Sequence, residues 1–426
     1  MVKSGKRSVS IIGAGTTPIG DVRSTPGMEG CTEKELFAMA SINAMEDAGV
    51  TPADLDAFYV GISGPNYDAK IKSAPSQFGN WIGMQDKPSF FHDEGCATGC
   101  YGLEAAVDAV ASGRYDCVIS TCVNINTCTP KACYPPFIRS QMDNETLWNT
   151  VYSATDPAFE KPGYGGAGPL DALPVLYCRK YGVSLEELDD AYVTYLLGKR
   201  REAMMNPIAV QCTMSYEDEA RFMGFDDVRE YLKSDTYNPL VGTVIRARYL
   251  GQTNVDASAA VIVCATELAD RYKGEPVEVA GISTAVCMGG SVLTLGPTEQ
   301  MIREVYNQAG ITDPYNEIQL LSVHDCPIST VVPVGEAAGY FKKGEGWKAM
   351  RDGELNFDGS KPANTCGSRT QTGHPRSPAF NIELRECRMQ MLGKAGDRQM
   401  PHKPKASLLW AGGAAWNLGA VVLKAL

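Results

Sequence analysis

The chain has 426 residues, of which 44% are hydrophobic, and it carries a formal net charge of −11 at pH 7. A chain of this length usually divides into more than one packed unit, so we expect two halves rather than a single core. Because nucleic acid binding depends on Lys and Arg neutralising phosphates, the acidic balance argues against a nucleic acid partner.

We expect no export or anchoring segment in the N-terminal region. Residues Met1 to Arg7 lead straight into a short apolar strand, which is too short for a signal-peptide core. No run approaches the roughly 18 apolar residues that cross a bilayer. Fourteen cysteines in such a chain fit a reducing compartment, where thiols serve packing, metal binding or chemistry. We therefore expect a cytoplasmic protein with no membrane partner.

The first predicted elements form an α/β unit. Residues Val9 to Gly15 read as a strand that ends in a glycine-rich turn, and apolar residues at helical spacing predict a helix from about Glu33 to Asp47. Residues 48–52, Ala-Gly-Val-Thr-Pro, are typical of a helix end, and the segment from Leu55 to Gly61 reads as the next strand.

The same order recurs later in the chain. A strand is predicted from Val277 to Ile282, a helix from about Glu299 to Gln308, a similar helix end at 309–313, and a strand from Ile318 to Val323. Each half also closes with an apolar strand, at 259–264 and at 420–423. An internal duplication of one α/β unit explains these matched landmarks. The alternative is two unrelated β-α-β units that share turn chemistry.

An excursion of different composition lies between the halves, from roughly Asn124 to Thr253. It carries few strand signals, helical stretches such as Leu185 to Arg200, and many Pro, Gly and aromatic residues. This composition suits a segment that covers a substrate. Two interpretations of its aromatic residues and their neighbours remain open, a small satellite core and a pocket for an acyl group. The residues concerned are Cys133, Tyr134, Pro135, Pro136, Phe137, Trp148, Tyr152, Phe159, Tyr164, Gly165 and Gly166.

Cys96 has the setting of a nucleophile. It lies in the run Glu94 to Gly102, between the strand-like Ser89 to Phe91 and a segment with apolar residues at helical spacing. Small neighbours leave the sulfur approachable, and a helix N-terminus favours the thiolate. Most free cysteines simply pack in cores, and Cys100, one helical turn further on, is the better candidate for that role.

Two of the four histidines stand in loops that suit chemistry. His324 follows a predicted strand in the run Val323 to Pro327, and His374 lies in a loop bounded by Gly and Pro. Loops that leave strand ends carry the reactive groups of many α/β proteins. Cys326 alternates with His324 and brings a second sulfur to the same place. A metal site competes with this interpretation, but the ligands lack the short paired spacing of structural zinc motifs. His92 and His402 are expected to be structural or surface residues.

Taken together, these segments resemble the thiolase superfamily, in particular the branch related to the sterol carrier protein thiolase. The motifs are the opening strand and turn, Gly-Cys-Ala-Thr-Gly at 95–99, the strand after Asp256, His-Asp-Cys at 324–326, Gly-His-Pro at 373–375 and Gly-Ala-Val-Val at 419–422. The resemblance implies a duplicated, five-layered α/β/α/β/α thiolase fold with an inserted loop domain, and at least a homodimer. We expect the N-terminal half at 1–123 and 254–270, the loop domain at 124–253, and the C-terminal half at 271–426.

The resemblance also implies roles for the candidate residues. Cys96 becomes acylated, His374 activates its thiol, and His324 donates to the thioester oxygen. Many degradative thiolases take a second cysteine from a C-terminal Cys-x-Gly motif, which this chain lacks, so the acid/base thiol falls to Cys326 as in the sterol-carrier branch. Backbone N–H groups of Cys96 and of the stretch Gly412, Gly413, Ala414 and Ala415 are candidates for a second oxyanion hole. Coenzyme A is then a co-substrate, with acyl-CoA as its partner substrate and no permanent cofactor or metal.

Two departures from the family pattern border the expected pocket. Pro327 stands where Phe is usual after His-Asp-Cys, and Arg376-Ser377-Pro378 replace the usual Ile-Gly-Ala. Arg376 suits a carboxylate or phosphate on the ligand, although a solvated loop arginine is the simpler interpretation. Some bacterial relatives work with a small zinc-ribbon and oligonucleotide-fold partner subunit, and one such system cleaves benzoylsuccinyl coenzyme A. The aromatic excursion and Arg376 suggest an aromatic or dicarboxylic acyl group of that kind.

Two other functions stay open from the sequence. A thiolase-like scaffold that binds coenzyme A without catalysis would explain the altered loops, but it gives no reason for four intact reactive groups. A condensing enzyme of the same fold, such as a ketoacyl or hydroxymethylglutaryl synthase, would also use a cysteine and histidines. Cys326 beside His324 favours the thiolase.

Overall fold

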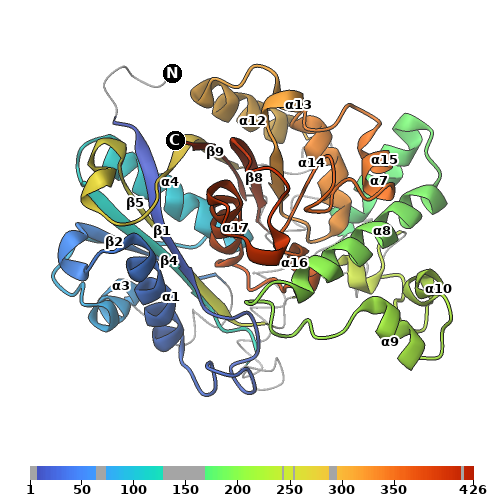
Figure 1. The fold of residues 1–426 in the computed structure, drawn as a ribbon, viewed down its shortest axis with the longest axis horizontal. Helices are drawn as coiled ribbons and strands as arrows, with labels where there is room; N and C mark the ends of the chain where they lie inside the picture. The colour runs from blue at the N-terminus through green and yellow to red at the C-terminus, as the bar shows by residue number, and fades with distance from the viewer. Residues whose placement is uncertain are drawn as a thin grey trace.

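The fold is built on one mixed sheet. The computed structural model describes residues 7–63, 73–127, 168–241, 244–252, 255–286, 295–413 and 417–426. Within these residues nine strands pair in the order β3-β2-β4-β5-β1-β6-β9-β8-β7 (Figure 1). The strands are β1 (Val9–Thr16), β2 (Ala57–Gly61), β3 (Ser89–His92), β4 (Cys117–Asn124), β5 (Ala257–Ala265), β6 (Val277–Val286), β7 (Leu320–Val323), β8 (Ala406–Gly412) and β9 (Asn417–Ala425).

The two halves of the sheet repeat one topology. Strands β2, β4, β5 and β1 of the first half correspond to β7, β8, β9 and β6 of the second, and the halves meet where β1 pairs with β6. In each half the first of these pairs is parallel and the following pairs are antiparallel. The internal duplication expected from the sequence is therefore confirmed.

Matched glycines show how closely the repeat holds. The register shifts just before Gly13 in β1 and just before Gly281 in β6, each the fifth residue of its strand. A Cβ at Gly13 would lie 2.5 Å from the carbonyl oxygen of Ala44, and one at Gly281 would lie 2.3 Å from that of Val305. Only glycine lets the backbone of a strand and a helix approach this closely.

Helices cover the sheet in layers. The outer helices are α1 (Glu33–Ala48) and α12 (Gly296–Ala309), and each ends at a glycine in the left-handed conformation, Gly49 and Gly310. Between the halves lie α4 (Thr98–Ala111) and α17 (Ala379–Leu392), which share one apolar cluster with strands of both halves. The succession from outer helix through half-sheet, central helices and second half-sheet to outer helix is the expected five-layered arrangement.

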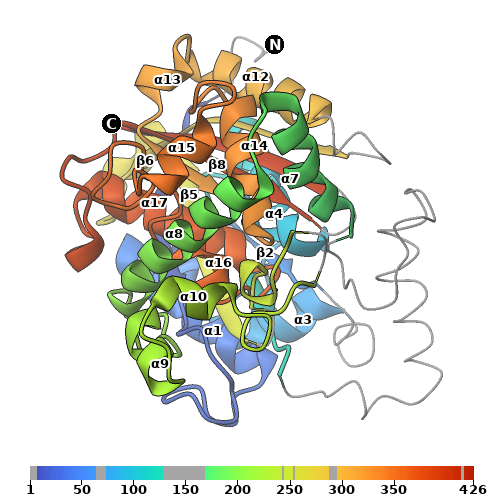
Figure 2. The same ribbon diagram turned by 90° about the vertical axis from the view of Figure 1, so that its right-hand side faces the viewer.

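The excursion between β4 and β5 is helical where it is described. It holds α7 (Gly168–Tyr181), α8 (Leu185–Met204), α9 (Tyr216–Phe222) and α10 (Val228–Lys233). Helix α8 runs along α15 (Gly346–Arg351) and α16 (Ser368–Gln371) of the second half (Figure 2). The other α-helices of the described residues are α3 (Ala74–Gly79), α13 (Pro314–Glu317) and α14 (Val331–Ala337). None of the helices in the described ranges is long and apolar enough to span a membrane.

Candidate active site

Cys96 sits in a tight turn between a strand and a helix, as expected. Strand β3 ends at His92, a 3-10 turn covers Gly95 to Ala97, and α4 begins at Thr98. The Thr98 hydroxyl accepts from the N–H of Glu94 at 2.8 Å and donates to the carbonyl of Gly95 at 2.6 Å. These two bonds close the turn ahead of the helix N-terminus and leave the Cys96 side chain partly exposed.

His374 meets Cys96 from the other half of the chain. Its Nε2 lies 3.1 Å from Sγ of Cys96, within hydrogen-bond reach for a sulfur. The imidazole is 1% exposed, and its backbone N–H donates to the carbonyl of Gln252 at 2.7 Å. Burial, followed by the charges of Arg369 and Arg376, holds the pKa of His374 well below its usual range. The ring is therefore neutral near pH 7, and one of its nitrogens has a free lone pair that can face the thiol.

His324 is oriented as a hydrogen-bond donor. It follows β7, and the backbone N–H of Gly412 donates to its Nδ1 at 3.2 Å. Burial, with a smaller contribution from Arg369, lowers the pKa of His324, so its one ring proton must sit on Nε2. That Nε2 is buried and has no hydrogen-bond partner among the described residues. The rings of His324 and His374 lie 5.1 Å apart, which puts this N–H beside the Cys96–His374 pair.

Cys326 completes the cluster. The backbone N–H of Gly251 donates to its Sγ at 3.2 Å. A Cβ on Gly251 would lie 2.9 Å from this sulfur and 3.1 Å from Cβ of His374, so the glycine lets its backbone pass between them. Burial, and next the nearby Cys96, raises the pKa of Cys326 to about 12. The thiol is thus protonated at neutral pH and can act as an acid.

Asp325 anchors the segment that carries His324 and Cys326, and no pattern in the sequence indicates its partners. The carboxylate is fully buried and accepts from the backbone N–H of Arg369 at 3.0 Å, from Asn364 Nδ2 at 2.8 Å and from the Tyr195 hydroxyl at 2.7 Å. A buried carboxylate is stable only when its oxygens have such donors.

A buried ion pair lies behind the cluster and was also missed. Arg369 donates through Nε and Nη2 to the two oxygens of Glu383 at 2.5 and 2.8 Å, and both side chains are almost fully buried. Burial opposes the charge on Arg369, but the Glu383 carboxylate, followed by Cys96 and Asp325, raises the pKa of Arg369. A fixed positive charge therefore stands close to the thiol and the two imidazoles.

The structure places the residues that were expected to bind the ligand in different settings. The N–H of Gly412 is used by His324, and the N–H of Gly413 donates to the Asn417 carbonyl at 2.6 Å, so neither is available as an oxyanion donor. These N–H groups were expected to face the ligand. They do not, because β8 and β9 pair as far as Gly412 and Leu418. Ala414 and Ala415 lie outside the described residues, as do the aromatic residues of the expected acyl pocket, from Cys133 to Tyr164. Arg376 is partly exposed, with a φ of 65°, and its charge acts on His374.

A metal is the competing occupant of this cluster. Single ligand atoms from Cys96, His324 and His374 all lie within 4.8 Å of one another. Neutral imidazole binds a metal through the nitrogen that has no proton. In His324 the Gly412 N–H occupies that nitrogen, and Nε2 carries the proton. The arrangement favours proton transfer and hydrogen bonding over metal binding.

The duplicated five-layered fold and the pairing of a cysteine with an imidazole at its centre define the chain as a thiolase-fold protein. Among solved structures, it superposes on one titled Ltp2-ChsH2(DUF35) aldolase with a TM-score of 0.73 and 18% identity, covering 99% of this chain and 98% of that one. Human mitochondrial 3-ketoacyl-CoA thiolase gives a TM-score of 0.65 at 16% identity over 99% of both chains. The expected fold is confirmed.

Sequence comparison finds thiolases and their relatives. Residues 282–425 match the family described as "Thiolase C-terminal domain-like". The chain is 29% identical to the acetyl-CoA acetyltransferase of Methanothermobacter thermautotrophicus, over 92% of this chain and 93% of that protein. It is 21% identical to bovine sterol carrier protein 2, over 93% of this chain and 68% of that protein. A shorter match, 24% over 36% of this chain and 40% of the other, is to the benzoylsuccinyl-CoA thiolase subunit BbsB of Thauera aromatica. The chain is thus similar over most of its length to acetyl-CoA acetyltransferases and to sterol carrier protein 2, and its C-terminal part matches the thiolase family.

Proposed function

We propose that the chain is a thiolase that cleaves a β-ketoacyl-CoA with coenzyme A through an acyl group carried on Cys96. The observation that carries this proposal is the 3.1 Å contact between Cys96 Sγ and His374 Nε2. A buried, neutral imidazole at this distance can take the thiol proton and leave a nucleophilic thiolate. The names of three relatives, two acetyl-CoA acetyltransferases and a benzoylsuccinyl-CoA thiolase subunit, agree with it.

In the first half-reaction, His374 takes the Cys96 proton and the sulfur attacks the keto carbon of the substrate. The bond between the α and β carbons then breaks, and its electron pair moves into the enolate of the departing thioester. His324 Nε2–H donates to the enolate oxygen, because this buried N–H has no hydrogen-bond partner within the described part of the chain. Cys326 gives its proton to the carbanion carbon, a role that a raised thiol pKa suits.

In the second half-reaction, the Cys326 thiolate takes the proton of free coenzyme A. The resulting thiolate attacks the acyl carbonyl on Cys96, and the bond between that carbonyl and the Cys96 sulfur breaks. Cys96 leaves as a thiolate and recovers its proton from His374, so all four side chains return to their starting states. The N–H of Gly251 on Cys326 stabilises the transient negative charge on this sulfur.

The acyl group that we propose is aromatic or dicarboxylic, as in benzoylsuccinyl-CoA. Arg376, partly exposed beside His374, supports the dicarboxylic choice because a guanidinium pairs well with a carboxylate. Comparing benzoylsuccinyl-CoA with acetoacetyl-CoA in wild type and Arg376→Ala tests it. We expect the variant to lose activity on the dicarboxylic substrate alone, and equal losses on both would refute the assignment.

The assembly that we propose is cytoplasmic and at least a homodimer, with a small zinc-ribbon and oligonucleotide-fold protein as a further partner. The names of two similar proteins support the partner: BbsB is a subunit, and the superposed aldolase contains a second component, ChsH2(DUF35). We also propose the division of the chain that the sequence indicated. One half spans 1–123 and 254–270, the other half spans 271–426, and a loop domain spans 124–253. Co-purification from the native host, followed by mass spectrometry, tests for the partner.

A thiolysis assay with a panel of β-keto thioesters tests the central proposal. We expect wild type to release two thioesters and Cys96→Ala to fold without turnover. Binding of coenzyme A with no turnover on any substrate would favour the scaffold alternative. Net condensation of two thioesters with no detectable thiolysis would favour the synthase alternative.

A further inference from the structure

Tyr195 links the excursion to the segment that carries Cys326. It lies on α8, between β4 and β5 in sequence, whereas Asp325 follows β7 in the second half. The Tyr195 hydroxyl donates to Oδ2 of Asp325 at 2.7 Å, and the exposed fractions of the two residues are 2% and 0%. A helix outside both halves of the sheet therefore reaches a residue that stands between His324 and Cys326.

The contact is one of several that saturate the Asp325 carboxylate. Asn364 Nδ2 also donates to Oδ2, at 2.8 Å, and the backbone N–H of Arg369 donates to Oδ1 at 3.0 Å. The donors come from separate segments of the chain, so rotation of the carboxylate would break hydrogen bonds to at least one of them. Buried groups held in this way keep a fixed orientation, and their covalent neighbours share it.

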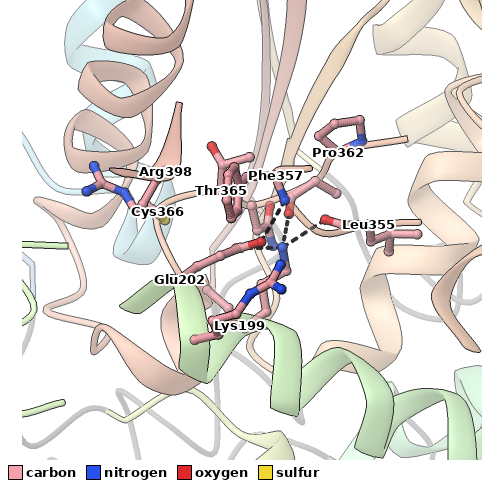
Figure 3. A network of polar contacts seen from close by, with 12 residues as sticks. Lys199, Glu202, Leu355, Phe357, Pro362, Thr365, Cys366 and Arg398 are labelled. Atoms are coloured by element: carbon pink, nitrogen blue, oxygen red, sulfur yellow. Dashed lines mark hydrogen bonds and ion pairs between the residues drawn. The ribbon is translucent and has the colours of Figure 1, made fainter. Parts of the chain in front are cut away.

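Helix α8 is itself held at a fixed depth. Lys199, one turn after Tyr195, is fully buried and donates through Nζ to Glu202 at 2.7 Å and to the carbonyls of Leu355 and Ala363 at 2.9 and 2.6 Å (Figure 3). A buried ammonium needs all of these acceptors, because unpaired charge in an interior is costly. Sliding or rotating α8 would remove them, so the helix presents Tyr195 to Asp325 at a set distance.

We propose that Tyr195 is a positioning residue for the His324-Asp325-Cys326 segment, acting through Asp325 from a helix that the Lys199–Glu202 pair anchors. The expected effect on catalysis rests on the proposed function. The expected effect on the position of the segment does not. Without the hydroxyl, Asn364 is the one donor to Oδ2 of Asp325 that remains among the described residues, and the segment gains freedom. The Cys326 thiol then becomes more solvated and less well placed to donate its proton.

The test compares Tyr195→Phe with Tyr177→Phe. Tyr177 is a matched control because its buried hydroxyl also donates to a buried carboxylate, Glu336, at 2.6 Å, on the neighbouring helix α7. In a Cys96→Ala background, iodoacetamide labelling of Cys326 is followed across pH by peptide mass spectrometry. We expect Tyr195→Phe to label about threefold faster or more at pH 8, with its midpoint at lower pH than the parent. Tyr177→Phe should label like the parent.

The same variants with Cys96 intact give the catalytic readout. We expect kcat of Tyr195→Phe to fall about tenfold while KM stays within about twofold, since positioning acts on the reacting groups rather than on ground-state binding. Labelling or kcat equal to that of Tyr177→Phe would overturn the proposal. If the wild-type chain has no thiolysis, the proposed function fails, and the labelling profile still decides the role of Tyr195.

Discussion

The backbone N–H of Gly412 donates to Nδ1 of His324 at 3.2 Å, and this contact fixes which ring nitrogen carries the proton. Strand β8 ends at Gly412, so the tautomer of a side chain in one loop is set by the sheet next to it. The consequence is an N–H on Nε2 aimed away from β8, in a site where the neighbouring imidazole contacts the thiol.

Replacing His324 should therefore lower catalysis more than folding. We expect His324→Ala to reduce kcat for thiolysis by about 10²–10³-fold, the usual effect of removing one oxyanion donor. Alkylation of Cys96 should proceed as in wild type, because the His374 contact remains. Steady-state kinetics and iodoacetamide labelling measure the two quantities, and a variant slow in labelling but normal in kcat would contradict this assignment.

Cys326 should act as an acid over an extended pH range. Burial raises its pKa to about 12, and a donor works while it is protonated, that is, below its pKa. We expect thiolytic cleavage to show no alkaline loss attributable to this thiol until well above its ordinary pKa of about 8.5. Cys326→Ala should lower the rate of acyl transfer by about 10²–10⁴-fold. A pH–rate profile with a Cys326-dependent fall near neutrality would refute the role.

The Arg369–Glu383 pair should matter for stability in an asymmetric way. Arg369→Met leaves a buried carboxylate without its bidentate partner, so we expect a loss of about 3–5 kcal/mol in the free energy of unfolding. Arg369→Met with Glu383→Met should recover most of this loss, because no uncompensated charge remains. Urea unfolding measures both, and the exposed pair Lys348–Glu345 offers a control in which Lys348→Met changes little. A double variant no more stable than the single one would contradict the prediction.

Acid should destabilise the protein through its buried histidines. Burial lowers the pKa of His92 to about 4, and neither ring nitrogen has a hydrogen-bond partner in the described residues. The unfolded chain binds this proton below pH about 6.5 while the folded chain does not, so stability falls from there toward pH 4 by about 1.4 kcal/mol per pH unit. Tm of His92→Gln should fall less steeply with pH, whereas exposed His402→Gln should follow wild type. Parallel curves for both variants would rule the explanation out.

Local patterns in the sequence were sufficient for much of the fold. The strand and helix that open each half were predicted within a few residues, because apolar spacing and the Gly49 and Gly310 helix ends are local signals. Strands β4 and β8 were not among the predicted elements. Both are short apolar runs in the interior of the sheet, where periodicity does not separate strand from helix.

The residues of the candidate site were likewise predicted only in part. Cys96, His324, Cys326 and His374 were singled out from loop chemistry, and the structure brings them together, while their catalytic roles remain predictions. Tyr195 and Arg369 could not be found this way. Tyr195 is 130 positions from Asp325, and a tyrosine in a helix or an arginine in a polar stretch is ordinarily read as a packing or surface residue. Only tertiary packing reveals their partners.

The most direct test of the central claim is the mass of Cys96 during turnover. Wild-type protein is mixed with a β-keto thioester in the absence of free coenzyme A, quenched in acid, and digested for peptide mass spectrometry. We predict that the peptide containing Cys96 gains the mass of the acyl group, that adding coenzyme A removes it, and that Cys96→Ala shows no adduct. Turnover of the same substrate with Cys96 never modified would contradict the account.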